Sequence, residues 1–127
     1  MNQIASTCRV LVVDDEADQR DSLAMLLEMK GIAADTAENG LAALDKLHGG
    51  KRYDIVLLDL MMPIMDGLTF WGEMSKDPDL ARIPVIVISG VAQFDAAKSI
   101  GAAAHLRKPV ALSQLYRTLE QHCPQAN

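Results

Sequence analysis

The feature that most constrains this chain is a run of four aliphatic residues, 55–58, which ends directly on a carboxylate, Asp59. An apolar run without polar alternation is typical of a strand that is buried on both faces, in the middle of a parallel sheet. Such a strand delivers its last residue to the carboxyl edge of the sheet, where open α/β folds bind ligands. Pro63 argues against a simple continuation of the strand. We therefore expect Asp59 at the mouth of a loop, held from behind by a rigid strand.

Strand and helix patterns alternate along the rest of the chain. Apolar stretches predict four further strands, over residues 9–13, 32–36, 84–89 and 103–107. Helical spacing of apolar residues predicts five helices, over residues 18–30, 39–48, 67–76, 93–100 and 111–122, with Asn39 as a cap and glycines such as Gly31 as stops. This alternation, with short connections, predicts one doubly wound α/β domain with a five-stranded parallel sheet and helices on both faces. The domain should take the whole chain, 1–127, with its core over about residues 9–122.

Apolar side chains on the helices identify the expected core contacts. Leu23, Leu26, Leu27, Leu41, Leu44, Leu47, Leu112, Leu115, Tyr116 and Leu119 are predicted to lie on the inner stripes of three helices. Of Phe70 and Trp71, one should be buried and the other partly exposed. The helix over 93–100 is short and rich in alanine, so we expect it to be the least stable element.

Composition excludes several classes of protein. A net charge of −5 argues against direct binding to nucleic acid. The sequence has no apolar run of about 18 residues, so no membrane span is expected, and its first residues lack the pattern of a signal peptide. A cytoplasmic protein is the expectation. Cys8 and Cys123 lie near opposite ends without metal-like spacing, so two reduced thiols are predicted.

Chemically capable side chains follow the predicted strands. Asp14 and Asp15 end the first, Asp59 the third, Ser89 the fourth and Lys108 the fifth. All strand ends of a parallel sheet meet at one edge, where three carboxylates would repel one another unless a cation neutralised them. Oxygen ligands without His or Cys select a hard ion, so Mg²⁺ is the expected cofactor. It would be bound by Asp15, Asp59 and a backbone carbonyl, with waters held by Asp14.

A carboxylate beside Mg²⁺ can act as a nucleophile toward phosphorus and form an aspartyl phosphate. Lys108 would supply a cation for a phosphoryl oxygen, and Ser89 a hydroxyl donor. No general base is placed to activate water, so a slow switch, and not an enzyme with turnover, is expected. The acid run 14–16 by itself is more often a solvated turn. Its combination with Asp59 and Lys108 favours the metal and phosphate interpretation.

At this point the chain resembles a known family, the response-regulator receiver domains of two-component signalling. The resemblance rests on Val-Val-Asp-Asp-Glu at 12–16, Asp-Leu-Met-Met-Pro-Ile-Met-Asp-Gly at 59–67, Ser89-Gly90 and Lys108-Pro109, and it covers residues 10–119. It implies the flavodoxin-like strand order 2-1-3-4-5 and a phosphoryl-accepting switch.

The resemblance also implies a role for each site residue. Asp59 would be the phosphoacceptor, Asp14, Asp15, Asp59 and the Met61 carbonyl would organise Mg²⁺, and Ser89 and Lys108 would contact the phosphoryl group. The Lys108-Pro109 bond would be cis. The implied partners are a histidine kinase or phosphotransfer protein, and either a downstream protein or a fused output domain. The face formed by residues 93–122 would change its affinity for partners on phosphorylation.

The sequence departs from the family pattern in two places. His105 stands where the family usually has Tyr or Phe, and the separation from Ser89 to Lys108 is a few residues short. Burying an uncharged histidine without a hydrogen bond is costly, so inward movement of this switch residue should be weak. The response should concentrate in residues 90–100 instead.

Three alternatives remain at this stage. One is a receiver-like interaction module that is not phosphorylated, which the complete set of acids, Ser89 and Lys108 disfavours. Another is a flavin or nucleotide carrier of the same architecture, whose first loop would have to cradle phosphate; here that loop is acidic. The third is a phosphoaspartate hydrolase, whose nucleophile normally ends the first strand. The chain could be a stand-alone receiver or one excised from a larger regulator or hybrid kinase.

Overall fold

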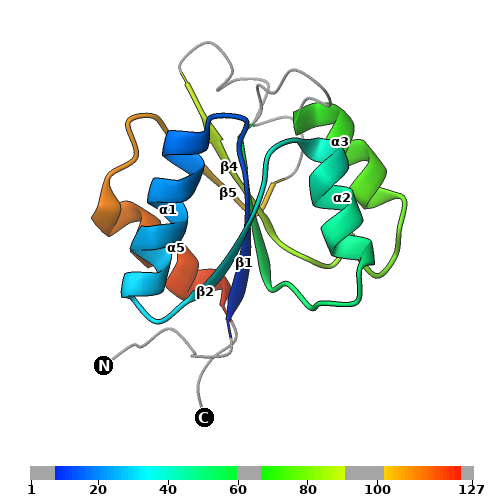
Figure 1. The fold of residues 1–127 in the computed structure, drawn as a ribbon, viewed down its shortest axis with the longest axis horizontal. Helices are drawn as coiled ribbons and strands as arrows, with labels where there is room; N and C mark the ends of the chain where they lie inside the picture. Colours follow the sequence, from blue (N-terminus) through cyan, green and yellow to red (C-terminus); the bar gives the residue numbers. More distant parts are fainter. Residues whose placement is uncertain (1–7, 60–66, 91–101, 124–127) are drawn as a thin grey trace.

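The computed structural model describes residues 8–59, 67–90 and 102–123, which form a sheet between two layers of helices (Figure 1). In chain order the elements are β1 (Arg9–Val13), α1 (Ala17–Met29), β2 (Ala33–Ala37), α2 (Gly40–His48), β3 (Ile55–Asp59), α3 (Gly67–Ser75), β4 (Val85–Ser89), β5 (Ala104–Arg107) and α5 (Leu112–His122). The strands form one parallel sheet in the order β2-β1-β3-β4-β5, so the predicted fold class and strand order are confirmed. The predicted helix over 93–100 lies outside the described residues.

Alternate side chains of the strands point to opposite faces of the sheet, which produces two apolar cores. Under α2 and α3, one core contains Leu11, Val13, Leu47, Val56, Leu58, Phe70, Met74, Val85 and Val87. Under α1 and α5, the other contains Val10, Val12, Leu27, Ile55, Leu57, Ile86, Ile88, Leu106, Leu115 and Leu119. Phe70 is fully buried and Trp71 is half-buried, as predicted. The central strands β1, β3 and β4 are thus clamped from both sides, which makes their carboxyl ends rigid supports.

Local signals in the sequence set the helix ends. The Asn39 side chain accepts a hydrogen bond from the N–H of Ala42 (2.8 Å), which caps the first turn of α2. Gly31 has a φ of 79°, a left-handed conformation that other residues adopt at a cost, and it directly follows the C-cap of α1. Both predictions are confirmed. Among the described helices, none combines the length and apolar character needed to cross a membrane.

Two leucines expected on inner stripes face solvent. Leu41 is 51% exposed and Leu112 is 42% exposed, so for these residues the prediction is wrong. Each lies in the first turn of its helix, α2 or α5, whereas Leu47, Leu115 and Leu119 further along are buried. In α5 the apolar stripe extends beyond the part of the helix that packs on the sheet. In α2 the buried face passes through Gly40, Ala43 and Leu47, which leaves Leu41 on the solvent side of the helix.

Cys8 and Cys123 form a disulfide, with their Cα atoms 5.7 Å apart, so the prediction of two reduced thiols is wrong. Cys8 directly precedes β1, Cys123 directly follows α5, and both side chains are buried in the core under α1 and α5. The two residues are 115 positions apart in the sequence. They meet because α5 runs back along the sheet toward the amino end of β1, a relationship that residue spacing does not reveal.

Candidate functional site

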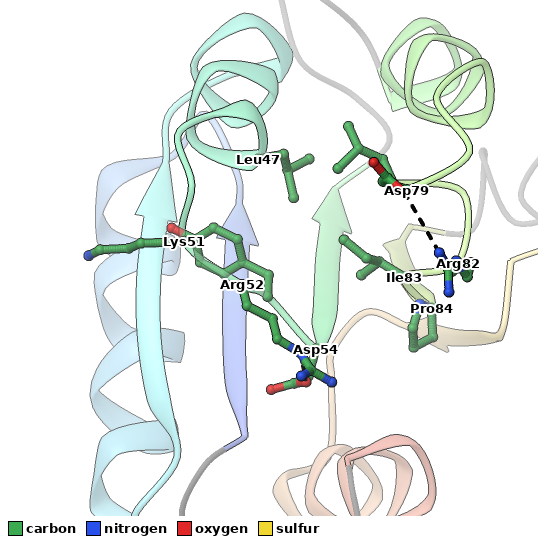
Figure 2. A pocket seen from close by; sticks show the side chains of 10 residues that line it. Leu47, Lys51, Arg52, Asp54, Asp79, Arg82, Ile83 and Pro84 are labelled. Carbon is green, nitrogen blue, oxygen red and sulfur yellow. Dashed lines mark ion pairs between the residues drawn. The ribbon is translucent and has the colours of Figure 1, made fainter.

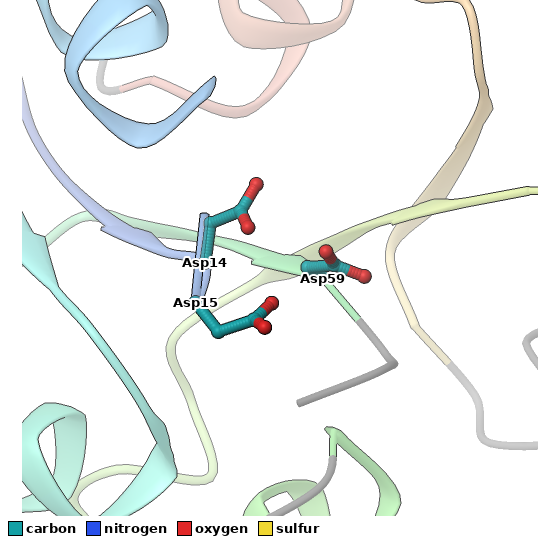
Figure 3. Close-up of side chains that lie close together, drawn as sticks. All are labelled: Asp14, Asp15 and Asp59. Carbon is teal, nitrogen blue, oxygen red and sulfur yellow. The ribbon is translucent and has the colours of Figure 1, made fainter. Parts of the chain in front are cut away.

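Three carboxylates meet at the carboxyl edge of the sheet, as predicted. One oxygen from each of Asp14, Asp15 and Asp59 lies within 4.8 Å of the others (Figure 3). Asp14 and Asp15 directly follow β1, and Asp59 is the last residue of β3, the strand paired with β1. The close approach therefore follows from the parallel register, which ends neighbouring strands at the same level.

The three carboxylates differ in their surroundings. Asp14 is 3% exposed and Asp59 is 7% exposed, whereas Asp15 is exposed to solvent. One oxygen of Asp14 accepts a hydrogen bond from the N–H of Glu16 (2.9 Å), and the N–H of Asp14 donates to the carbonyl of Ala37 (3.1 Å). Asp14 is therefore fixed at both its backbone and its side chain.

Burial raises the pKa of Asp14 from 3.8 to about 6. The hydrogen bond from Glu16 opposes this effect by lowering the pKa, the nearby Asp59 carboxylate raises it, and the Lys108 ammonium lowers it. Desolvation and repulsion thus outweigh the favourable contacts. A divalent cation among the three carboxylates would remove the repulsion, and an all-oxygen ligand set with carboxylates suits Mg²⁺.

Lys108 brings a positive charge to Asp59 from the far side of the cluster. Its ammonium nitrogen lies 3.3 Å from an oxygen of Asp59. Lys108 directly follows β5, and its peptide bond to Pro109 is cis, as the resemblance implied. Asp59 is therefore a buried carboxylate with acids on one side and a cation on the other.

Ser89 ends β4, the strand adjacent to β3, and its side chain is 1% exposed. Within the described residues its hydroxyl oxygen makes no hydrogen bond. A buried hydroxyl without a partner costs free energy, so its presence needs an explanation. Its position at the carboxyl edge would allow the hydroxyl to donate a hydrogen bond to a ligand bound there.

The remaining predicted site residues are less informative. His105 lies in β5 opposite Val87 of β4 and is half-buried. Met61 lies outside the described residues, so its carbonyl is not placed.

The sequence interpretation missed one neighbour of the cluster, Arg20 in the first turn of α1. Its guanidinium donates a hydrogen bond to the backbone carbonyl of Asp14 (Nη1–O 3.0 Å). The available signal was a single basic residue in an otherwise acidic or neutral helix, in the first turn after the acid run 14–16.

Two cavities differ in their relation to this site. A cavity of about 470 Å³ opens beside it, between α1 and the segment after β5, with Asp14 and Lys108 in its lining. A larger one, about 600 Å³, lies at the amino edge of the sheet (Figure 2). Arg82 pairs there with Asp79 (3.7 Å) and Arg52 with Asp54 (3.6 Å), and Lys51 pairs with Asp35 (3.5 Å), which lies outside the lining. The carboxyl edge, with its repelling acids and unpaired hydroxyl, is therefore the better candidate for chemistry.

Known proteins resemble this chain in sequence and in fold. Residues 10–120 match the family model of the response regulator receiver domain. The chain is 41% identical over 98 residues to protein-glutamate methylesterase/protein-glutamine glutaminase 1 of Anaeromyxobacter dehalogenans, covering 76% of this chain and 27% of that protein. It is 37% identical over 110 residues to response regulator MprA of Mycobacterium sp. strain KMS, covering 84% of this chain and 46% of that protein. The chain thus spans less than half the length of these relatives.

Solved structures agree over nearly their whole length. A response regulator receiver protein from Pseudomonas putida superposes with a TM-score of 0.83 at 31% identity, covering 93% of this chain and 99% of that chain. The chemotaxis protein CheY4 of Vibrio cholerae superposes with a TM-score of 0.80 at 27% identity, covering 91% of this chain and 98% of that chain.

Proposed function

The chain belongs to the response regulator receiver domain family, and from this premise we propose that it is a phosphoryl-accepting switch in which Asp59 takes the phosphoryl group. The observation that carries the proposal is the convergence of charges on this one carboxylate. Asp14 and Asp15 lie within 4.8 Å of Asp59, and the Lys108 ammonium lies 3.3 Å from it. A carboxylate that attacks a phosphoryl group needs a metal cation to offset the negative charge and a positively charged group to bind the phosphoryl oxygens. The three acids could hold the cation, and Lys108 is the positively charged group.

Asp14, Asp15, Asp59 and the Met61 carbonyl would hold Mg²⁺. Mg²⁺ bound there would neutralise charge on the carboxylates and on the phosphoryl oxygens. Burial, together with the nearby Asp59 carboxylate, raises the pKa of Asp14, and a cation bound among the three acids would offset both effects by favouring the ionised form. Asp15, the exposed member, would bind the ion directly, and the buried Asp14 would orient its waters.

The chain's own side chains account for the transfer. An oxygen of Asp59 bonds to phosphorus while the phosphorus–nitrogen bond of a phosphohistidine breaks, and the electron pair returns to the imidazole nitrogen. Lys108 exchanges its contact with Asp59 for one with a phosphoryl oxygen. The Ser89 hydroxyl donates to another phosphoryl oxygen and gains the partner that it lacks.

The donor of the phosphoryl group would be a histidine kinase or a phosphotransfer protein. The signal would pass from the face that includes β5 and α5 to a downstream protein or a fused output domain. No histidine is among the residues proposed to bind the ion or the phosphoryl group, and the carboxylates are assigned to these two roles. The phosphorylated state should therefore be long-lived, without turnover of a separate substrate. A cytoplasmic setting fits this role.

Intact mass after incubation with acetyl phosphate and Mg²⁺ tests the proposal. Wild-type protein should gain one phosphoryl group, and Asp59→Asn should gain none. Asp79→Asn, an exposed acid at the opposite edge of the sheet, serves as the matched control and should label normally. Absence of labelling in wild type would instead favour an interaction module that is not phosphorylated, and retained labelling of Asp59→Asn would overturn the assignment.

A further inference from the structure

Arg20 contacts the backbone between the two neighbouring acids of the site. Its side chain is 17% exposed, and Nη1 donates to the carbonyl oxygen of Asp14 at 3.0 Å. That carbonyl belongs to the peptide unit that joins Asp14 to Asp15. Hydrogen bonds from a charged donor are stronger than neutral ones. A charged side chain therefore holds the peptide from which Asp15 projects.

The position of Arg20 is not explained by helix stability. Arg20 is the fourth residue of α1, and a cation in the first turn is disfavoured by the partial positive charge of a helix N-terminus. Its one ion pair in α1, to Asp21, spans 3.9 Å, and the Asp21 side chain is 71% exposed. Such surface pairs contribute little. The hydrogen bond to the Asp14 carbonyl is therefore the main favourable interaction that we find for Arg20 at this position.

Asp15 needs external support to stay near the other acids. It is exposed, and it has two carboxylates for neighbours, so repulsion favours conformations that turn it away. Three hydrogen bonds hold the residue before it: from Asp14 to Ala37, from Glu16 to Asp14, and from Arg20 to Asp14. Of these three bonds, only the one from Arg20 acts on the Asp14 carbonyl group, whose carbon is bonded directly to the backbone nitrogen of Asp15.

We propose that Arg20 is a positioning residue for the cation site: it fixes the Asp14–Asp15 peptide so that the Asp15 carboxylate is presented to the ion. This inference rests on the proposed function, because it concerns the same site. Arg20 itself touches neither the ion nor the phosphoryl group. Loss of such a supporting contact typically weakens metal binding by roughly 10- to 100-fold, and the lower end is expected for a contact to the backbone.

The sign of the effect separates positioning from simple electrostatics. If Arg20 acted only through its charge, its removal would leave less positive charge near the acids, and Mg²⁺ would bind more tightly. If it positions Asp15, its removal weakens Mg²⁺ binding although a repelling charge is gone. The two roles therefore predict changes in opposite directions.

Calorimetric titration with Mg²⁺ on the full chain tests the inference. Arg20→Met should bind Mg²⁺ roughly 10-fold more weakly than wild type, and Arg20→Lys, which keeps a charged donor, should recover most of the affinity. Arg82→Met is the matched control, because it removes the same charge from an exposed pair at the opposite edge, and it should bind like wild type. At saturating Mg²⁺, Arg20→Met should accept a phosphoryl group from acetyl phosphate at the wild-type rate.

Unchanged or tighter Mg²⁺ binding by Arg20→Met, beside normal binding by wild type, would overturn the inference alone. A lower melting temperature of metal-free Arg20→Met, with a phosphorylation rate that stays low at saturating Mg²⁺, would also overturn it, because that pattern indicates a general structural role. A wild-type protein that binds no Mg²⁺ would overturn the metal site of the proposed function, and this inference with it.

Discussion

The backbone N–H of Lys108 donates a hydrogen bond to the carbonyl of Ser89, 2.9 Å away. These are the two residues proposed to bind phosphoryl oxygens: Ser89 ends β4, and Lys108 directly follows the neighbouring strand β5. A phosphoryl group on Asp59, with roughly 1.5 to 2 negative charges, would therefore pull on two joined strand ends at once. The hydrogen bond between Lys108 and Ser89 is therefore where we expect the conformational change to begin.

Hydrogen exchange should reveal where the signal goes from there. With the phosphoryl mimic beryllofluoride, protection should rise first in residues 89–100, because they follow Ser89 directly. His105 is half-buried and polar, so its inward movement should be weak. Strong protection of α5 with unchanged amides in residues 89–100 would contradict this route.

Ser89→Ala should have opposite effects on the stability of the free protein and on the stabilisation by a phosphoryl mimic. The Ser89 hydroxyl is buried without a partner in the described part of the chain, so its removal should raise the free energy of unfolding of the metal-free protein by about 1 kcal/mol. The same variant should gain less stability from beryllofluoride than wild type does, because one donor to the mimic is lost. Urea denaturation with and without the mimic measures both effects. A destabilised metal-free Ser89→Ala would indicate that the hydroxyl already has a partner.

Asp14 should make stability depend on pH. Its folded-state pKa is about 6, above the value of 3.8 for the unfolded chain, so the folded state holds this proton more tightly. The free energy of unfolding should therefore fall as pH rises from about 4 to about 6, by up to roughly 3 kcal/mol. Asp14→Asn should abolish this component and be more stable than wild type at pH 7.5 without metal.

Urea denaturation of Asp14→Asn and wild type across pH 4 to 7.5 measures the difference. Asp15→Asn is the control at the exposed neighbour. Added Mg²⁺ should reverse the order, because wild type gains binding free energy that Asp14→Asn partly loses. If the two proteins show the same pH dependence, the buried carboxylate is not the cause.

The Cys8–Cys123 disulfide should stabilise the fold from the edge opposite the site. It closes a loop of 115 residues, so reduction should lower the free energy of unfolding by about 2 to 4 kcal/mol. The double variant Cys8→Ser, Cys123→Ser should match the reduced wild type and should not respond to dithiothreitol. Thiol titration of the unfolded, unreduced protein should find no free thiol. Two free thiols in protein isolated without air would contradict the disulfide.

Much of the fold was predictable because its signals are local. Uninterrupted apolar runs mark β1, β3 and β4, and they place Asp14, Asp59 and Ser89 at strand ends. The Asn39 cap and the Gly31 stop depend only on the conformation of a few adjacent residues. The convergence of three acids followed once the strands were taken as parallel, since parallel strands end at one edge.

Tertiary structure alone decided the rest. Leu41 and Leu112 continue apolar stripes in the sequence, yet they face solvent, because exposure depends on how a helix is rotated against the sheet and on which of its turns pack there. Arg20 contacts Asp14, and Cys8 bonds to Cys123, because the folded backbone brings them together. Residue patterns report the periodicity of single elements, whereas contacts between elements depend on the register and packing of the whole sheet.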